Sequence, residues 1–410
     1  MARTTITSIR AREILDSRGN PTLDVTVSCE GGSGSFAVPS GASTGSHEAL
    51  ELRDGDMSRF LGRGVLKAAT HVNVNLSGLL TGMDALDQRA VDGRMIELDG
   101  TANKSNIGGN ATIGVSLACA RAAAASTQLP LAKHLHSLAP KIKPSRTTPF
   151  LCMNVINGGK HAATNVAFQE YKIIPQTADI HEALMIGTQM SHALKDMVSR
   201  QYGTQNANVG DEGGLAPHLE SIRRPLELLM EVAQKLRLDQ KIKLALDVAA
   251  SSFYDATTKS YVYDDAQHVT GDLTETLRGL MRDFPIQYIE DPYHEEAFED
   301  FTRLNDGTCL IVGDDLTVTN RDRIALASSA QSVSGVIIKP NQIGTLSETL
   351  DAMQYARDHG IECIISHRSG ETNDAFIVDL ALAFGAYGIK AGGLQRGERI
   401  AKYNRFLELL

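Results

Sequence analysis

A series of short apolar runs in the second half of the chain, each ending in an ionisable residue, constrains the possible folds most strongly. The six ionisable residues are Asp247, Glu290, Asp314, Lys339, His367 and Lys390. From the second run onward they recur at intervals of roughly 25 residues, and each interval contains one amphipathic helical pattern. The first interval is longer and contains a hairpin-like insertion around residues 261–263. This repeat predicts parallel strands joined by helical crossovers.

A parallel sheet of this kind closes most simply into a β/α barrel, and its remaining strands are expected between residues 150 and 240. Closure would place all six charges on the carboxy-terminal rim, where barrel enzymes keep their reactive groups. Chance polar residues at strand ends would explain one or two such positions, but not six in succession.

The first part of the chain has a different pattern. Residues 5–15, 22–29 and 35–39 predict a three-stranded meander, and residues 110–126 predict an alanine-rich helix. A segment with two prolines and several cations follows, and it is interpreted as a linker. The predicted fold class is therefore α/β, a carboxy-terminal β/α barrel preceded by a smaller α+β domain. The expected parts are an amino-terminal capping domain (1–136), a linker (137–149) and a catalytic barrel (150–410).

Charge and cysteine content limit the functional class. A net charge of −9 argues against a general nucleic-acid binder, because such proteins need a positive face. The five cysteines form no CxxC pair, which is typical of a reducing compartment. No signal peptide and no apolar stretch of membrane-spanning length is evident. We therefore expect a cytoplasmic enzyme without a membrane span.

Three carboxylates, Asp247, Glu290 and Asp314, end three successive predicted strands. Buried together without a counter-ion they would repel one another, and a divalent cation resolves this. Ligation by oxygen alone favours Mg²⁺ or Mn²⁺ over zinc. The alternative is three solvated acids at the starts of loops.

The next three strands end in basic residues: Lys339, then His367-Arg368-Ser369, then Lys390. This half of the rim suits a phosphate and a carboxylate, because Arg368 offers a planar fork and Ser369 a hydroxyl. A lysine crowded by other cations and a metal is expected to have a lowered pKa, which would suit a general base. The alternative is a set of surface lysines.

Two further segments carry candidate groups. In the glycine-rich run Asn208–Gly214, Glu212 is a candidate acid for a leaving hydroxyl. The loop at residues 157–161 adds His161, and the pair Gln169-Glu170 adds an amide and another acid.

Several long motifs together resemble the enolase family over essentially the whole chain. They are DSRGNPT (16–22), SGASTG (40–45), HEALELRDGD (47–56), NVGDEGG (208–214), IEDP (289–292), GDDLTVTN (313–320), NQIGTL (341–346), SHRSGET (366–372) and ERIAKYN (398–404). The resemblance implies an enolase-type barrel and reversible dehydration of 2-phospho-D-glycerate to phosphoenolpyruvate, in glycolysis and gluconeogenesis. The implied cofactor is two Mg²⁺ ions per active site.

The same resemblance implies a role for individual residues. Asp247, Glu290 and Asp314 match the ligands of the first Mg²⁺, and Ser43 helps to hold the second. Lys339 matches the base that takes the carbon-bound proton, and Glu212 the acid that assists loss of hydroxide. The implied substrate-binding residues are Arg368 and Ser369 (phosphate), Lys390 (carboxylate), and His161, Gln169, Glu170 and His367 (pocket wall). The second loop departs from the family pattern, because it reads GGKHA where GGSHA is usual and so places Lys160 beside the site.

Other functions and properties stay open at this point. A related enzyme could abstract the proton next to a carboxylate on another phosphorylated or phosphonate substrate. A non-catalytic structural or surface-adhesion protein is a third reading. The resemblance also implies a homo-oligomer, either dimer or octamer, with a cytoplasmic location to which a cell-surface or secreted pool could be added.

Overall fold

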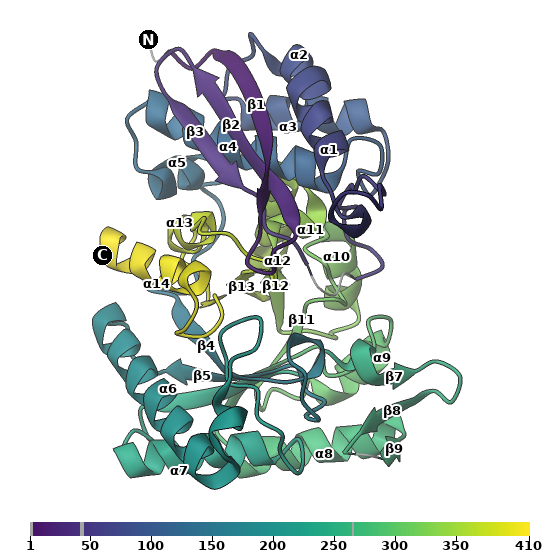
Figure 1. Ribbon diagram of the computed structural model, residues 1–410, viewed down its shortest axis with the longest axis vertical. Coiled ribbons are helices and arrows are strands. Elements are labelled where there is room, and N and C mark those ends of the chain that lie inside the picture. The colour runs from purple at the N-terminus through teal and green to yellow at the C-terminus, as the bar shows by residue number, and fades with distance from the viewer. Residues whose placement is uncertain (1–2, 42–44, 265) are drawn as a thin grey trace.

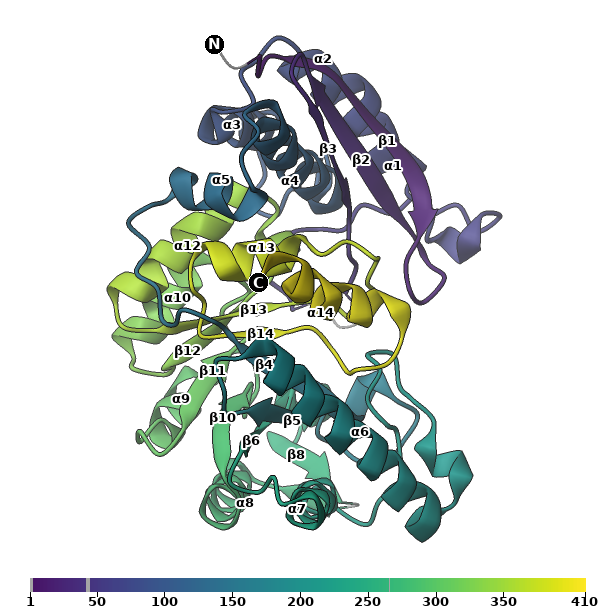
Figure 2. The ribbon, with the colours of Figure 1, turned by 90° about the vertical axis from the view of Figure 1, so that its left-hand side faces the viewer.

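The computed structural model describes residues 3–41, 45–264 and 266–410. An amino-terminal part with its own sheet lies against one side of a closed barrel (Figures 1 and 2). None of the helices in the described residues combines the length and the apolar character that a membrane span requires.

The amino-terminal part begins with the predicted meander. Strands β1 (Ile6–Leu15), β2 (Pro21–Cys29) and β3 (Ser33–Ala37) form an antiparallel sheet in that order. The helices that follow are α1 (Leu66–Thr70), a π-helical segment (His71–Leu76), α2 (Ser77–Leu80), α3 (Gln88–Asp99), α4 (Gly109–Ser126) and α5 (Leu131–Leu138).

The predicted alanine-rich helix is α4, and it is the central helix of this part. It packs on β2 and β3 and also contacts α3, α5, α11 and α12, so most of its residues are buried. A helix that is covered on nearly all sides must be apolar all round. Its many alanines meet this requirement while letting neighbouring elements approach closely.

The barrel confirms the predicted α/β fold class. Its strands, in hydrogen-bonded order, are β4 (Phe150–Asn157), β5 (Glu170–Pro175), β6 (Ile242–Asp247), β10 (Ile286–Glu290), β11 (Leu310–Gly313), β12 (Gly335–Ile338), β13 (Glu362–Ser366) and β14 (Gly388–Lys390). The helices are α6 (Ile180–Tyr202), α7 (Arg224–Leu236), α8 (Thr270–Asp283), α9 (Phe298–Leu304), α10 (Arg321–Ser329), α11 (Pro340–Ile343), α12 (Leu346–Asp358), α13 (Phe376–Ala383) and α14 (Gly397–Leu409). The six strands predicted from the sequence are all parallel neighbours.

Two features differ from a simple repeat. Strand β5 is antiparallel to both β4 and β6, so its first residues, and not its last, lie at the rim where the other strands end. The loop from β4 to β5 therefore begins and ends at that same rim. The insertion in the long interval is a small three-stranded sheet of β7 (Tyr254–Asp255), β8 (Ser260–Tyr263) and β9 (Ala266–His268).

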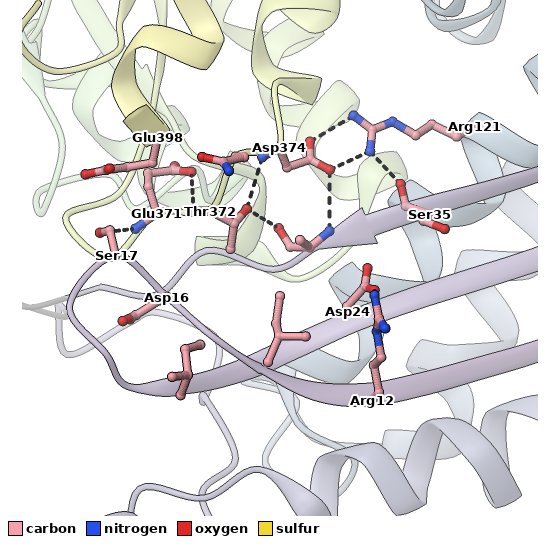
Figure 3. Close-up of a pocket in the computed structure, with 14 residues that line it drawn as sticks. Arg12, Asp16, Ser17, Asp24, Ser35, Arg121, Glu371, Thr372, Asp374 and Glu398 are labelled. Atoms are coloured by element: carbon pink, nitrogen blue, oxygen red, sulfur yellow. Dashed lines mark hydrogen bonds and ion pairs between the residues drawn. The ribbon is translucent and has the colours of Figure 1, made fainter. Parts of the chain in front are cut away.

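The two parts are joined by polar contacts as well as by packing. Arg121 of α4 donates to both carboxylate oxygens of Asp374 in the barrel, at 2.5 and 2.8 Å (Figure 3). The backbones of Ser40 and Gly370 exchange two hydrogen bonds of 2.7 and 2.8 Å. These contacts fix the loop after β13 against the amino-terminal part.

The close approach of β3 to α4 yields a stability prediction. A Cβ at Gly34 would overlap the backbone nitrogen of Ala122 and the Cβ of Arg121, whereas a Cβ at Gly93 meets no atom within 4 Å. We expect Gly34→Ala to lower the free energy of unfolding by about 1–3 kcal/mol. The control Gly93→Ala should leave it unchanged or raise it by up to about 1 kcal/mol, because alanine favours a helix. Denaturant unfolding of both variants tests this, and equal stabilities would contradict it.

Candidate active site

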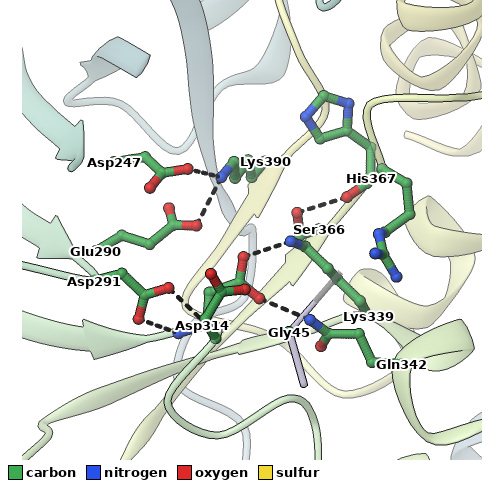
Figure 4. A network of polar contacts seen from close by, with 12 residues as sticks. Gly45, Asp247, Glu290, Asp291, Asp314, Lys339, Gln342, Ser366, His367 and Lys390 are labelled. Carbon is green, nitrogen blue, oxygen red and sulfur yellow. Dashed lines mark hydrogen bonds and ion pairs between the residues drawn. The ribbon is translucent and has the colours of Figure 1, made fainter. Parts of the chain in front are cut away.

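The alternation of side chains along the barrel strands sets the site. Apolar residues such as Ala245, Tyr288, Val312 and Ile337 fill the barrel interior. Since side chains alternate along a strand, the residue two positions later also points to the axis, one layer closer to the rim. These later residues are Asp247, Glu290, Asp314 and Lys339, and Figure 4 shows them converging with Lys390.

Lys390 is the cation at the centre of this cluster. Its Nζ donates to Asp247 Oδ2 at 2.9 Å and to Glu290 Oε1 at 2.7 Å, and it lies 3.2 Å from Glu170 Oε2. Lys172 approaches from β5 and bridges Glu170 and Glu290 at 3.0 and 2.9 Å. All five side chains are buried, so each charge depends on these partners instead of water.

The expectation that Lys339 has a lowered pKa is wrong for this structure. Burial lowers the pKa of Lys339, but the carboxylates around it, Asp314 first and then Glu290, together raise it above its usual value. For Asp314, burial raises the pKa, yet Lys339 and Lys390 together hold it well below its usual range. The expectation considered neighbouring cations and a metal, and it did not consider a direct carboxylate partner.

Two carboxylates beside this cluster were not singled out from the sequence. Asp291 accepts from the backbone nitrogens of Asp314 and Asp315 at 2.9 and 2.7 Å. Burial and the charge of Asp315 raise the pKa of Asp291, and burial and Asp314 raise the pKa of Asp315 to about 8. Oxygen atoms of Asp291, Asp314 and Asp315 lie within 4.8 Å of one another.

The donor set of Asp291, Asp314 and Asp315 fits a hard divalent cation. It supplies only carboxylate oxygens, the ligands that Mg²⁺ and Mn²⁺ prefer. Burial first and the charge of Asp247 second raise the pKa of Glu290.

Glu212 and its neighbours form the opposite wall. Its Oε2 accepts from Asn154 Nδ2 at 3.1 Å and lies 3.4 Å from His161 Nδ1 and from His367 Nε2. Burial lowers the pKa of His161, but Glu212 and Glu170 outweigh it and raise it to about 10. Burial raises the pKa of Glu212, and the two histidines hold it well below its usual range. Both shifts favour a proton on His161 over a proton on Glu212.

Arg368 connects the site to the amino-terminal part. Its Nη2 donates to both oxygens of Glu48, at 3.2 and 2.9 Å, and its Nη1 donates to Asn341 Oδ1 at 2.9 Å. Ser369 lies beside it and accepts from Arg18 Nη1 at 3.4 Å. Glu48 and Arg18 belong to motifs quoted from the sequence, but their contact with the barrel could be found only from the structure.

The structure brings nearly all the predicted residues to one cavity. It is lined by the predicted residues His161, Gln169, Glu170, Glu212, Asp247, Asp314, Lys339, His367, Arg368, Ser369 and Lys390, together with Gly41, Ala249, Asp291 and Asp315. Gln169 donates to Asp247 Oδ2 at 3.3 Å. Glu290 reaches the cluster through Lys390 and Lys172. Ser43 lies outside the described residues.

Known families match both parts of the chain. Residues 6–135 match a family described as "Enolase, N-terminal domain", and residues 145–409 match "Enolase, C-terminal TIM barrel domain". The chain is 46% identical to a protein named Enolase from Methanocaldococcus jannaschii, over 98% of this chain and 94% of the relative. It is 44% identical to a protein named Enolase B from Dictyostelium discoideum, again over 98% of this chain and 94% of the relative.

These matches cover both domains, and the identity extends over nearly the whole length of each relative. Most of the carboxylates and lysines that the family resemblance singled out line one buried cavity, and Glu290 reaches it through Lys390. The chain therefore belongs to the enolase family and is a hydro-lyase.

Proposed function

We propose that this enolase removes water from 2-phospho-D-glycerate to form phosphoenolpyruvate, and catalyses the reverse reaction, with the residue roles given below. The observation that supports the proposal is one buried cavity in which carboxylates face Lys339, Arg368 and Lys390. A proton next to a carboxylate is scarcely acidic, because its loss adds charge to a group that is already anionic. Fixed positive charge where the enolate develops is the means of lowering that barrier.

Lys339 and Glu212 are assigned to the two proton transfers. Lys339 takes the proton from carbon, and Glu212 assists loss of hydroxide from the opposite side of the cavity. Protonated His161, 3.4 Å from Glu212, supplies the proton that Glu212 must deliver. The acid is thus best treated as a pair that shares a proton, since strongly interacting groups titrate together.

The remaining polar side chains bind the substrate. Arg368 and Ser369 hold the phosphate, with Arg368 oriented in advance by Glu48 and Asn341. Lys390 contacts the substrate carboxylate. The other pocket residues in this proposal are His161, Gln169, Glu170 and His367.

Two Mg²⁺ ions complete the proposed site, the first held by Asp247, Glu290 and Asp314 and the second with the help of Ser43. When bound, the ions supply the positive charge that stabilises the enolate. Lys390 and Lys339 pair with the same carboxylates, which supports the assignment of a cation site here.

Several wider properties are proposed from the sequence pattern and from the family. We propose a division into a capping domain (1–136), a linker (137–149) and a catalytic barrel (150–410). We also propose a cytoplasmic homo-oligomer, either a dimer or an octamer.

Removal of divalent cations should abolish activity. We expect no phosphoenolpyruvate to form from 2-phosphoglycerate in excess EDTA, and added Mg²⁺ should restore the reaction, because the proposed ligands are all oxygen atoms. The absorbance of phosphoenolpyruvate measures both states. Full turnover in EDTA would contradict the metal assignment, and no turnover with Mg²⁺ would contradict the proposed reaction.

The roles of Lys339 and Glu212 can be separated by hydrogen exchange. Lys339→Ala should stop exchange of the carbon-bound hydrogen with deuterated solvent. Glu212→Gln should slow dehydration by about 10²–10⁴-fold while much of the exchange persists, because an enolate lies between the steps. NMR of the substrate and absorbance of the product report the two steps, with Lys235→Ala on the exposed face of α7 as the control. Exchange that survives in Lys339→Ala but disappears in Glu212→Gln would reverse the assignment.

Arg368→Ala should weaken substrate binding through loss of charge-assisted bonds of roughly 1.5–3 kcal/mol. Ser369→Ala should have a smaller effect, about 0.5–1.5 kcal/mol, because its hydroxyl is neutral. Titration of 2-phosphoglycerate into each variant measures the change. The control is Arg94→Ala, since Arg94 is an exposed arginine of α3 that pairs with Glu97. Unchanged affinity in Arg368→Ala would place the phosphate elsewhere.

A further inference from the structure

The motif at residues 398–404 has no part in the proposed reaction, yet it contains two fully buried cations. Arg399 and Lys402 lie one turn apart on α14, and both are 0% exposed. A buried charge is costly unless it is paired and hydrogen-bonded. The partners of these two residues therefore indicate what the buried face of α14 does. Figure 2 shows where this helix lies on the molecule.

Every terminal N–H of Arg399 is directed at the walls of the active site. Nη1 donates to Nδ1 of His367 and to the carbonyl oxygen of Arg368, both at 2.6 Å. Nη2 donates to the carbonyl oxygens of Ser369 at 2.6 Å and Asp211 at 3.0 Å. One rigid fork thus joins the loop that carries His367 to the loop that carries Glu212.

The contact with His367 fixes where the ring proton lies. A guanidinium has donors only, so Nδ1 of His367 must accept, and a ring that is neutral then carries its hydrogen on Nε2. Burial lowers the pKa of His367, Glu212 raises it and Arg399 lowers it, with a net lowering that keeps the ring neutral. Nε2 lies 3.4 Å from Glu212 Oε2 and has no hydrogen-bonding partner among the described residues.

We propose that Arg399 is a positioning residue for Glu212, which holds His367 in the tautomer whose Nε2–H faces the Glu212 carboxylate. With the other tautomer, the Nε2 lone pair would face a carboxylate oxygen, and the two acceptors would repel. Arg399 acts in this way on the step that the proposed function assigns to Glu212, loss of the hydroxyl, and it is not among the residues that line the cavity.

Lys402 provides the matched comparison. Its Nζ donates to Glu371 Oε2 at 2.7 Å and to the carbonyl oxygen of Thr372 at 2.6 Å, so it holds the same loop without touching the ring of His367. Loss of Lys402 therefore removes structural support for the loop, whereas loss of Arg399 removes support and the tautomer constraint together.

The first test reads the tautomer directly. The ¹⁵N chemical shifts of His367 in the full-length, ligand-free protein distinguish a protonated Nε2 from a protonated Nδ1. We expect Nε2–H in the wild type and in Lys402→Met, and a mixture of tautomers or a charged ring in Arg399→Met and Arg399→Lys. His367 with Nδ1–H in the wild type, or an unchanged tautomer in both Arg399 variants, would overturn the proposal. This measurement needs no substrate, so its failure is distinct from failure of the proposed function.

The second test measures the dehydration step separately from hydrogen exchange. Arg399→Lys, which keeps the charge but not the fork, should slow dehydration about 10²-fold while exchange of the carbon-bound hydrogen falls much less. In Arg399→Ala, added guanidinium should restore dehydration and added methylammonium should not, because only a planar group can donate to Nδ1 and the carbonyls together. Equal loss of exchange and dehydration in Arg399→Lys, or rescue by both cations, would show that Arg399 only supports the fold.

Discussion

The structure depends on pairing many carboxylates with a few cations at the end of a dry barrel. Lys390 and Lys172 hold Glu170, Asp247 and Glu290 in one network, and Lys339 pairs with Asp314. In the low dielectric of such a site an unpaired charge is expensive. The barrel can keep these acids close together only because cations come from several strands at once. This requirement explains why strands far apart in the sequence end in charges of opposite sign.

The charged rim of the barrel could be predicted because the apolar strand patterns and the spacing between them are local properties of the sequence. An apolar strand that ends in an ionisable residue can be recognised without any tertiary contact, and all six predicted strands are present. In four of them the charge follows an inward apolar side chain by two residues. The direction of β5 could not be predicted, because the residue pattern of a single short strand is the same whether it pairs parallel or antiparallel with its neighbours. Lys172 and Arg399 were also missed as members of the site, since one lies inside a strand and the other on a helix that the rim pattern does not include.

Electrostatic detail was the least predictable level. The composition of the rim suggested that cations would lower the pKa of Lys339, whereas the nearest group to its ammonium is the carboxylate of Asp314. Similarly, the acidity of Glu212 is set by His161 and His367, which come from loops that the sequence placed only approximately. Such shifts depend on distances of a few ångströms between side chains, and a one-dimensional pattern does not contain those distances.

The contribution of the amino-terminal part to the cavity has a consequence for how such genes can recombine. Glu48 orients Arg368, Arg18 reaches Ser369, and Ser40 is bonded through its backbone to Gly370. A chimaera could join the barrel of one homologue to the amino-terminal domain of another. The two sides of each of these contacts would then come from different parent proteins. Crossovers between residues 50 and 360 would therefore be tolerated only where both parents agree at these contacts. The two domains should consequently be inherited as a unit, despite their separate sheets.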